Sequence, residues 1–167
     1  MAGWSDQEFD EFVASRLSRL VPFGYALTGD LGHAEDIVQT ALAKTYAATR
    51  RRTLDDPEAY VRRAIVTANL SRFRRRRVVE DLVDVVPEAG DHVDATSALE
   101  RREAVQAMLG GLSPRQRTVL VLRYQEDWSE QEIAAAMGVS AGTVKTLASR
   151  AMTRLRATVR PEERSEA

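Results

Sequence analysis

The chain has 167 residues, enough for one ordinary domain or two small ones, and a formal net charge of −1. It contains no cysteine, which excludes disulfides, thiol catalysis and cysteine-ligated zinc and suits a reducing cytoplasm. Because aromatic residues, glycine and proline are few and no apolar run is long enough to span a membrane, we expect an all-α, cytoplasmic protein without a signal peptide.

Two helices are expected at the start of the chain. Ser5 and Glu8 have the spacing of a capping box, and an apolar face with helical periodicity follows them. Pro22 lies inside this pattern and is expected to kink or restart the first helix. Residues 28–30 break the pattern, and the second helix should run from about residue 32 to residue 50. The exposed face of this second helix would carry Glu35, Asp36, Gln39 and Lys44.

A third helix should begin at Asp56-Pro57, where a capping residue is followed by proline at the first helical position. It ends in residues 72–77, in which five arginines surround Phe73. Cations suit the C-terminus of a helix, so a merely solvated end is one interpretation. Five arginines exceed what capping needs, and we favour contact with a nucleic-acid backbone.

The acidic charge is concentrated in residues 79–97, which hold 6 Asp or Glu and no Lys or Arg. Residues 1–78 hold 13 basic against 10 acidic residues, and residues 98–167 hold 11 against 9. The acidic segment also contains proline and glycine and keeps no periodicity for long. It is predicted to be a flexible linker between an N-terminal domain, residues 1–78, and a C-terminal domain, residues 98–167.

The C-terminal domain is expected to contain a helix-turn-helix. After helices over residues 98–109 and 114–124, Ser129 starts a short helix and Gly138 ends it. Ser140 caps a longer helix with one apolar face, and the opposite face is polar and basic. This pattern is typical of a helix that enters the major groove, whereas an ordinary helical hairpin with a solvated basic face is the alternative.

Two blocks of this sequence resemble the two domains of a bacterial sigma factor. The segment LSPRQRTVLVLRYQEDWSEQEIAAAMGVSAGTVKTLASRAMTRLR resembles the C-terminal, promoter-reading domain. The segments GDLGHAEDIVQTALAKTY and DPEAYVRRAIVTANLSRFRRRR resemble the N-terminal domain. The chain has only these two domains and a short linker. In this it resembles the extracytoplasmic-function group of sigma factors, in particular the SigE-like actinobacterial branch.

This resemblance implies a non-enzymatic protein that binds core RNA polymerase, recognises the two elements of a promoter and helps to open the duplex. It implies no cofactor, metal or catalytic residue, and it raises an anti-sigma protein as a further partner. The residues implied to bind polymerase are Glu35, Asp36, Gln39 and Leu42.

The resemblance also implies two sets of residues that contact promoter DNA. Those for the duplex upstream element are Arg115, Arg117, Thr143, Lys145, Thr146, Ser149 and Arg150. Those for the single-stranded downstream element are Tyr60, Arg63, Thr67, Arg72, Phe73, Arg74, Arg75 and Arg76. Aromatic platforms and cations suit an unstacked strand, but Thr67 stands where many members of the family have asparagine.

Two other functions are alternatives to the sigma-factor interpretation. A free-standing helix-turn-helix regulator would bind duplex DNA without polymerase, but it leaves the N-terminal block unexplained. An enzyme is disfavoured because His33 and His92 stand alone and no triad, metal spacing or phosphate-binding loop occurs.

Overall fold

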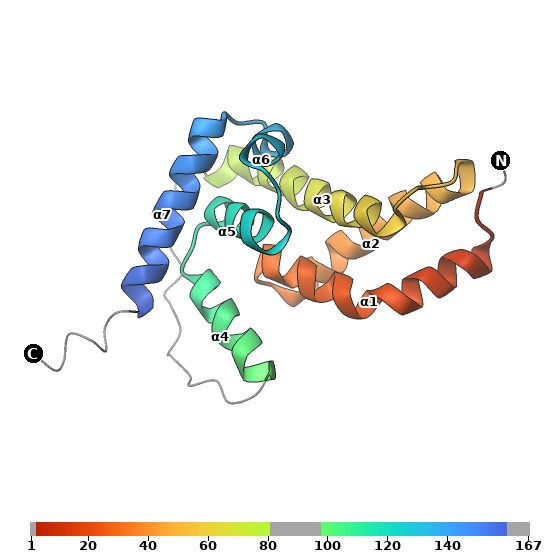
Figure 1. The fold of residues 1–167 in the computed structure, drawn as a ribbon, viewed down its shortest axis with the longest axis horizontal. Coiled ribbons are helices and arrows are strands. Elements are labelled where there is room, and N and C mark those ends of the chain that lie inside the picture. The colour runs from red at the N-terminus through yellow and green to blue at the C-terminus, as the bar shows by residue number, and fades with distance from the viewer. Residues whose placement is uncertain (1–2, 81–97, 160–167) are drawn as a thin grey trace, which may run out of the picture. The chain divides into compact units, whose positions relative to one another are not determined.

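The computed structural model of the chain describes residues 3–80 and 98–159, and all regular elements within these ranges are helices (Figure 1). The expectation of an all-α fold is therefore confirmed for the described residues. The chain divides into two compact units, Met1–Leu82 and Val83–Ala167, and each is described by itself. Most of the predicted acidic linker, residues 81–97, lies outside the described residues.

The first unit consists of three helices, α1 (Asp6–Thr28), α2 (Leu31–Arg51) and α3 (Pro57–Glu80). Helix α2 packs against both α1 and α3, so the apolar faces of all three helices meet in one core. The largest side chains that are almost completely buried in this core are Leu20, Phe23, Leu27, Val38, Val61, Ile65 and Val66.

The first helix begins as expected but does not restart at Pro22. Ser5 and Glu8 form the complete capping box, and α1 continues through Pro22 to Thr28. A proline inside a helix removes one hydrogen bond, which frees the carbonyl group of Ser18. Ser18 and Pro22 are both exposed, so water can satisfy that carbonyl group. Of the two outcomes expected at Pro22, a restart of the helix is therefore wrong, because α1 is continuous through this residue.

The second unit contains α4 (Ala98–Gly110), α5 (Pro114–Leu120), α6 (Glu130–Met137) and α7 (Ala141–Val159). A single helix was expected over residues 114–124, but α5 passes into a π-helical turn at Val121–Gln125. The wider turn leaves Leu122 completely buried and Tyr124 61% exposed. Leu122 therefore belongs to the apolar core of this unit, whereas Tyr124 lies largely at its surface.

Candidate nucleic-acid and partner interfaces

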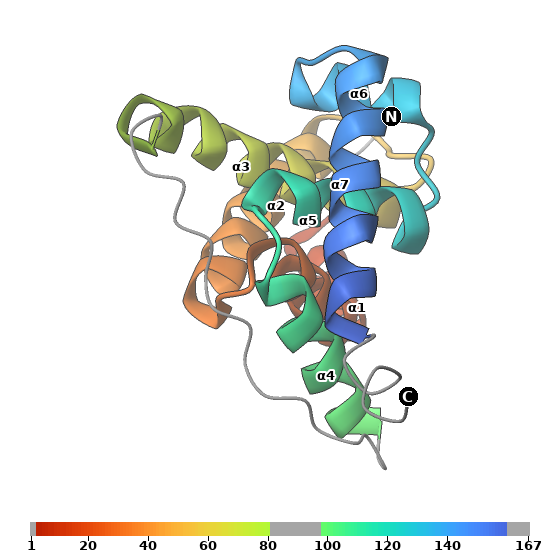
Figure 2. The same cartoon turned by 90° about the vertical axis from the view of Figure 1, so that its left-hand side faces the viewer.

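The helix-turn-helix is formed by α6, a short turn and α7 (Figure 2). Ser129 and Glu132 make a complete capping box at the start of α6, and Gly138 ends it with a left-handed φ of 66°. Ser140 starts the next helix, because its Oγ accepts a hydrogen bond of 3.1 Å from the backbone N–H of Thr143. Both helices contribute buried side chains to the core of the unit, namely Ile133, Ala134, Val144, Ala148 and Ala151.

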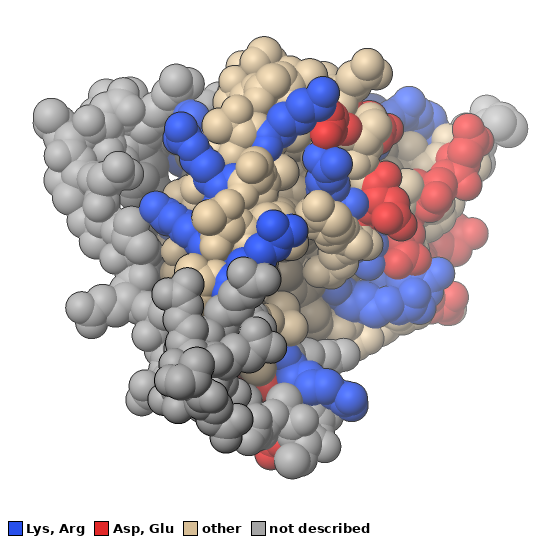
Figure 3. Space-filling model, turned by 60° about the vertical axis from the view of Figure 1, so that its left-hand side comes forward, with Lys and Arg blue, Asp and Glu red and all other residues tan. Residues whose placement is uncertain are grey.

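The face of α7 that points away from this core is polar and exposed. Every predicted residue of this helix lies on that face, namely Thr143, Lys145, Thr146, Ser149 and Arg150. In Figure 3, Lys and Arg side chains are spread over the surface that α7 forms. A helix with exposed hydroxyl, ammonium and guanidinium groups can meet both phosphates and base edges in a major groove.

The structure separates the two arginines that were predicted to contact phosphates near α7. Arg115 is partly exposed, as such a contact requires. Arg117 is only 7% exposed, and its guanidinium group donates a hydrogen bond to Oε1 of Gln106 in α4. The side chain of Arg117 thus joins α5 to α4 inside the unit, and its burial does not support the predicted phosphate contact.

The sequence interpretation missed two charged residues beside α7. Glu130, the first residue of α6, accepts a hydrogen bond of 2.6 Å from Nη1 of Arg123. The other carboxylate oxygen of Glu130 lies 3.8 Å from Nζ of Lys145. No motif marked this cluster, because its members are brought together only by the π-helical turn and the crossing of α6 with α7.

In the first unit, the predicted polymerase-binding residues follow one side of α2. Glu35, Asp36 and Gln39 are exposed, and Leu42 is half-buried beside them. Ile37, Val38 and Ala41 are buried on the opposite side of the same helix. The acidic and amide groups therefore form a surface that a partner can contact without disturbing the core.

The predicted residues for single-stranded DNA all lie along α3. Tyr60 is half-buried, and the Arg52 guanidinium group lies 5.9 Å from the centre of its ring. Arg63 and Thr67 are exposed one turn apart, and the Thr67 hydroxyl donates a hydrogen bond of 2.9 Å to the Arg63 carbonyl group. The structure thus brings a stacking surface and cations to one side of the unit.

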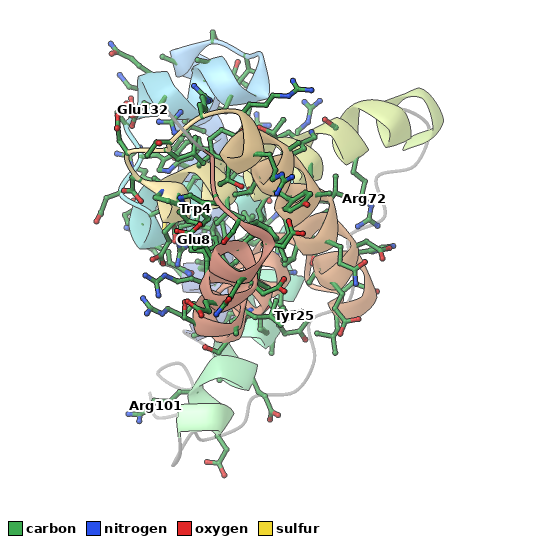
Figure 4. The ribbon with its side chains drawn as sticks, turned by 90° about the vertical axis from the view of Figure 1, so that its right-hand side faces the viewer. Trp4, Glu8, Tyr25, Arg72, Arg101 and Glu132 are labelled. Atoms are coloured by element: carbon green, nitrogen blue, oxygen red, sulfur yellow. The ribbon has the colours of Figure 1, made fainter. Side chains whose placement is uncertain are left out.

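Arg72 is partly buried and extends from α3 towards α2 (Figure 4). Its Nη2 atom lies 2.8 Å from Nε2 of His33, near the start of α2. The backbone of residues 73–76 continues α3, but the side chains of Phe73, Arg74, Arg75 and Arg76 lie outside the described part of the chain.

The start of α2 carries a shifted carboxyl group. Asp30 is the N-cap of α2, and its Oδ1 accepts a hydrogen bond of 2.9 Å from the backbone N–H of His33. This hydrogen bond lowers the pKa of Asp30, and the charges of His33 and Arg72 act in the same direction. The carboxylate form is therefore favoured where α2 and α3 meet.

The described residues contain neither a metal-binding cluster nor a membrane-spanning helix. No group of three or more His, Cys, Asp or Glu side chains there could hold a metal ion. Within the same residues, no helix has both the length and the apolarity needed to cross a membrane.

Comparison with known proteins identifies the class to which these two units belong. Residues 12–78 match the family model described as Sigma-70 region 2, and residues 102–155 match that of Sigma-70, region 4. The RNA polymerase sigma-E factor of Streptomyces coelicolor is 40% identical over 152 residues, which cover 89% of this chain and 84% of that protein. The corresponding factor of Streptomyces avermitilis is 37% identical and is covered to 83%.

Solved structures agree with this assignment. The sigma factor RpoE in its complex with the anti-sigma factor NepR from Bartonella quintana has a TM-score of 0.61 and 26% identity, covering 93% of this chain and 98% of that one. The extracytoplasmic function sigma factor SigJ of Mycobacterium tuberculosis has a TM-score of 0.56 and 28% identity, over 87% of this chain and 52% of its own.

The chain belongs to the extracytoplasmic-function group of sigma-70-type RNA polymerase sigma factors. It is a sigma factor, a regulatory protein that directs promoter-specific initiation of transcription. The resemblance found in the sequence is confirmed.

Proposed function

We propose that the two units divide the work of a sigma factor, with α2 binding core RNA polymerase and α7 reading the upstream promoter element. The observation that carries this proposal is the helix-turn-helix, whose second helix presents an uninterrupted polar face from Thr143 to Arg150. Lys145 and Arg150 on this face can pair with phosphates or with guanine edges, and the hydroxyl groups can meet either base type. Arg115 adds a phosphate contact at the start of α5.

For the downstream element, we propose that single-stranded DNA follows α3 from Tyr60 towards its arginine-rich end. The Tyr60 ring, with the cation of Arg52 beside it, supports this proposal as a stacking surface. Exposed Arg63 and Thr67 continue the same path. We include Arg72, Phe73, Arg74, Arg75 and Arg76 in the proposed path because of their positions in the sequence.

The polymerase contact is proposed for Glu35, Asp36, Gln39 and Leu42 on α2. These side chains lie on one side of the helix and leave its buried side free to hold the unit together. A partner with basic groups would complement the two carboxylates.

The cellular setting follows from this role. We propose that the protein acts in the cytoplasm, has no enzymatic activity or cofactor of its own, and is held inactive by an anti-sigma protein. Support for the last point is that the RpoE structure from Bartonella quintana contains the anti-sigma factor NepR. A free-standing regulator is the less favoured alternative, because residues 12–78 match Sigma-70 region 2.

Reconstitution with core polymerase tests the division of work. Asp36→Arg reverses a charge on α2 and should reduce co-purification with core enzyme at least tenfold. Asp10→Arg makes the same charge change at an exposed position of α1 and should leave co-purification unchanged. Arg150→Ala should leave core binding unchanged and weaken binding to upstream-element duplex. If Asp36→Arg and Asp10→Arg bind core enzyme equally well, α2 does not make this contact.

A further inference from the structure

A carboxylate stands between two cations beside the proposed DNA-reading helix. Its oxygens belong to Glu130 on α6, and the cations belong to Arg123 in the π-helical turn and Lys145 on α7. The side chain of Glu130 is 26% exposed, whereas that of Lys145 is 69% exposed. The cluster therefore joins three elements, and its lysine is the most exposed of the three side chains.

The two contacts of Glu130 differ in strength. The hydrogen bond from Arg123 is short, at 2.6 Å, and both partners are charged and partly buried. Arg123 is itself held over the Tyr124 ring, 5.7 Å from its centre. By contrast, the 3.8 Å contact with Lys145 is long and exposed, and such pairs are weak. The carboxylate is thus held in place by Arg123, and the exposed ammonium group of Lys145 lies beside it in a weaker contact.

We propose that Glu130 is a positioning residue that makes promoter binding more selective by restraining Lys145. This inference rests on the proposed function, in which the exposed face of α7 enters the major groove. A lysine ammonium group is a point charge on a flexible stem, so without restraint it pairs with whichever phosphate is nearest. Phosphate contacts carry no sequence information, whereas contacts with base edges do.

The restraint affects selectivity because Glu130 has different effects on the two targets of Lys145, the base edges and the phosphates. In the proposed docking, an ammonium group that stays within reach of Glu130 remains on the exposed side of α7, which faces the base edges of the groove. To pair with the DNA backbone, it must leave the carboxylate, which also repels the phosphates. Glu130 therefore disfavours sequence-independent docking more than it disfavours base contact, and only such a difference can produce selectivity.

Glu130→Gln removes the charge while keeping the size of the side chain. We expect this variant to bind unselected duplex about two- to fivefold more tightly. The increase is small because the contact that Lys145 loses is one exposed ion pair, and such pairs are weak. Its salt dependence should become steeper, because Lys145 then adds a phosphate contact. Preference at the base pair that Lys145 reads should weaken.

Two further variants distinguish restraint from simple repulsion. Glu130→Asp keeps the charge but shortens the side chain, so that the Arg123-held carboxylate no longer reaches Lys145. It should lose the base preference with little gain in affinity for unselected duplex. Glu103→Gln removes the charge of an exposed carboxylate on α4 and serves as the matched control, with wild-type selectivity.

The test is selection of duplexes from a random library by the full chain, followed by titration at several salt concentrations. Wild type is compared with Glu130→Gln, Glu130→Asp, Glu103→Gln, Lys145→Ala, Arg150→Ala and the double variant Glu130→Gln/Lys145→Ala. The expected result is that Lys145→Ala erases preference at one or two base pairs, that both Glu130 variants weaken it at the same pairs, and that Glu130→Gln has no further effect once Lys145 is absent.

Strictly additive effects of the Glu130→Gln and Lys145→Ala changes, or unchanged preferences in both Glu130 variants, would overturn the inference while leaving α7 on the DNA. If Lys145→Ala and Arg150→Ala both bind every duplex as wild type does, the placement of α7 itself fails. The two failures are therefore distinguishable. Thermal unfolding of each variant confirms that the unit remains folded.

Discussion

The backbone of Gly3 lies directly against Thr49, with no room for a side chain between them. A Cβ atom at Gly3 would stand 2.4 Å from the Thr49 carbonyl oxygen and 2.4 Å from that of Arg50. The next residue, Trp4, donates its backbone N–H to the same Thr49 oxygen at 2.9 Å. The segment before α1 is therefore closed onto the last turn of α2, where it satisfies a carbonyl group that the helix leaves open.

This close approach predicts that Gly3→Ala destabilises the first unit. The atoms that an added methyl group would meet are backbone, so relief requires the segment to move away and the Trp4 hydrogen bond to break. We expect a loss of about 1–3 kcal/mol in the free energy of unfolding, the usual cost of forcing a methyl group into a packed site. Urea unfolding followed by circular dichroism measures it, and hydrogen exchange of the Trp4 amide reports the bond.

Gly110→Ala is the matched control for this change, since nothing lies within 4 Å of a Cβ built at Gly110. It should be neutral or slightly stabilising, because alanine restricts the unfolded chain. A Gly3→Ala protein with the wild-type midpoint and a protected Trp4 amide would show that the segment does not pack as described.

Arg115 and Arg117 provide a second prediction, since they share a helix but not an environment. Arg117→Ala removes the donor to Gln106 and should lower the stability of the second unit by about 1–3 kcal/mol, because a partly buried acceptor is left unpaired. Arg115→Ala should keep the stability and weaken DNA binding with a flatter salt dependence. Thermal unfolding and duplex titration of the two variants should therefore give opposite patterns.

The local signals in the sequence predicted the ends of the helices well. Ser5 and Ser129 start helices with complete capping boxes, and Gly138 ends one in the left-handed conformation. Each of these features depends on residues within one helical turn, so the sequence contains all the information needed. The exposed face of α7 was equally predictable from its period.

Features that depend on contacts between elements could not be predicted in the same way. Arg117 is of a residue type that often binds phosphates. That its side chain is buried becomes evident only from its packing against α4. Asn69 is 1% exposed inside α3, although its type usually lies at the surface. The π-helical turn and the Arg123–Glu130 contact likewise arise from tertiary packing, which no short motif encodes.

A third prediction concerns the acid dependence of stability at Asp30. Because the hydrogen bond from His33 lowers its pKa on folding, the unfolded chain takes up a proton more readily. The ionised Asp30 side chain stabilises the folded state fully at pH values above the ordinary aspartate pKa, about 3.9. This contribution is lost as the pH falls through the lower pKa that Asp30 has in the folded state. Asp30→Asn keeps a capping side chain but removes this titration.

Urea midpoints between pH 3 and 6 test the sign of this effect. The difference in stability between wild type and Asp30→Asn should favour wild type more at pH 6 than at pH 3. A constant difference across the range would show that the cap does not titrate in this way.

The final prediction concerns Thr67, where this chain departs from the asparagine of many family members. Its hydroxyl group donates to the Arg63 carbonyl at 2.9 Å, so its donor is used within α3 and only its acceptor capacity faces outward. An asparagine there would offer both a donor and an acceptor to a base taken out of the stack. Sites that pair with a base edge discriminate sharply, because a wrong partner leaves polar groups unpaired. We therefore expect Thr67→Asn to sharpen or shift preference within the downstream element, measured as transcription from promoters varied at each of its positions. Equal preferences and equal opening rates for the two proteins would show that Thr67 serves only its own helix.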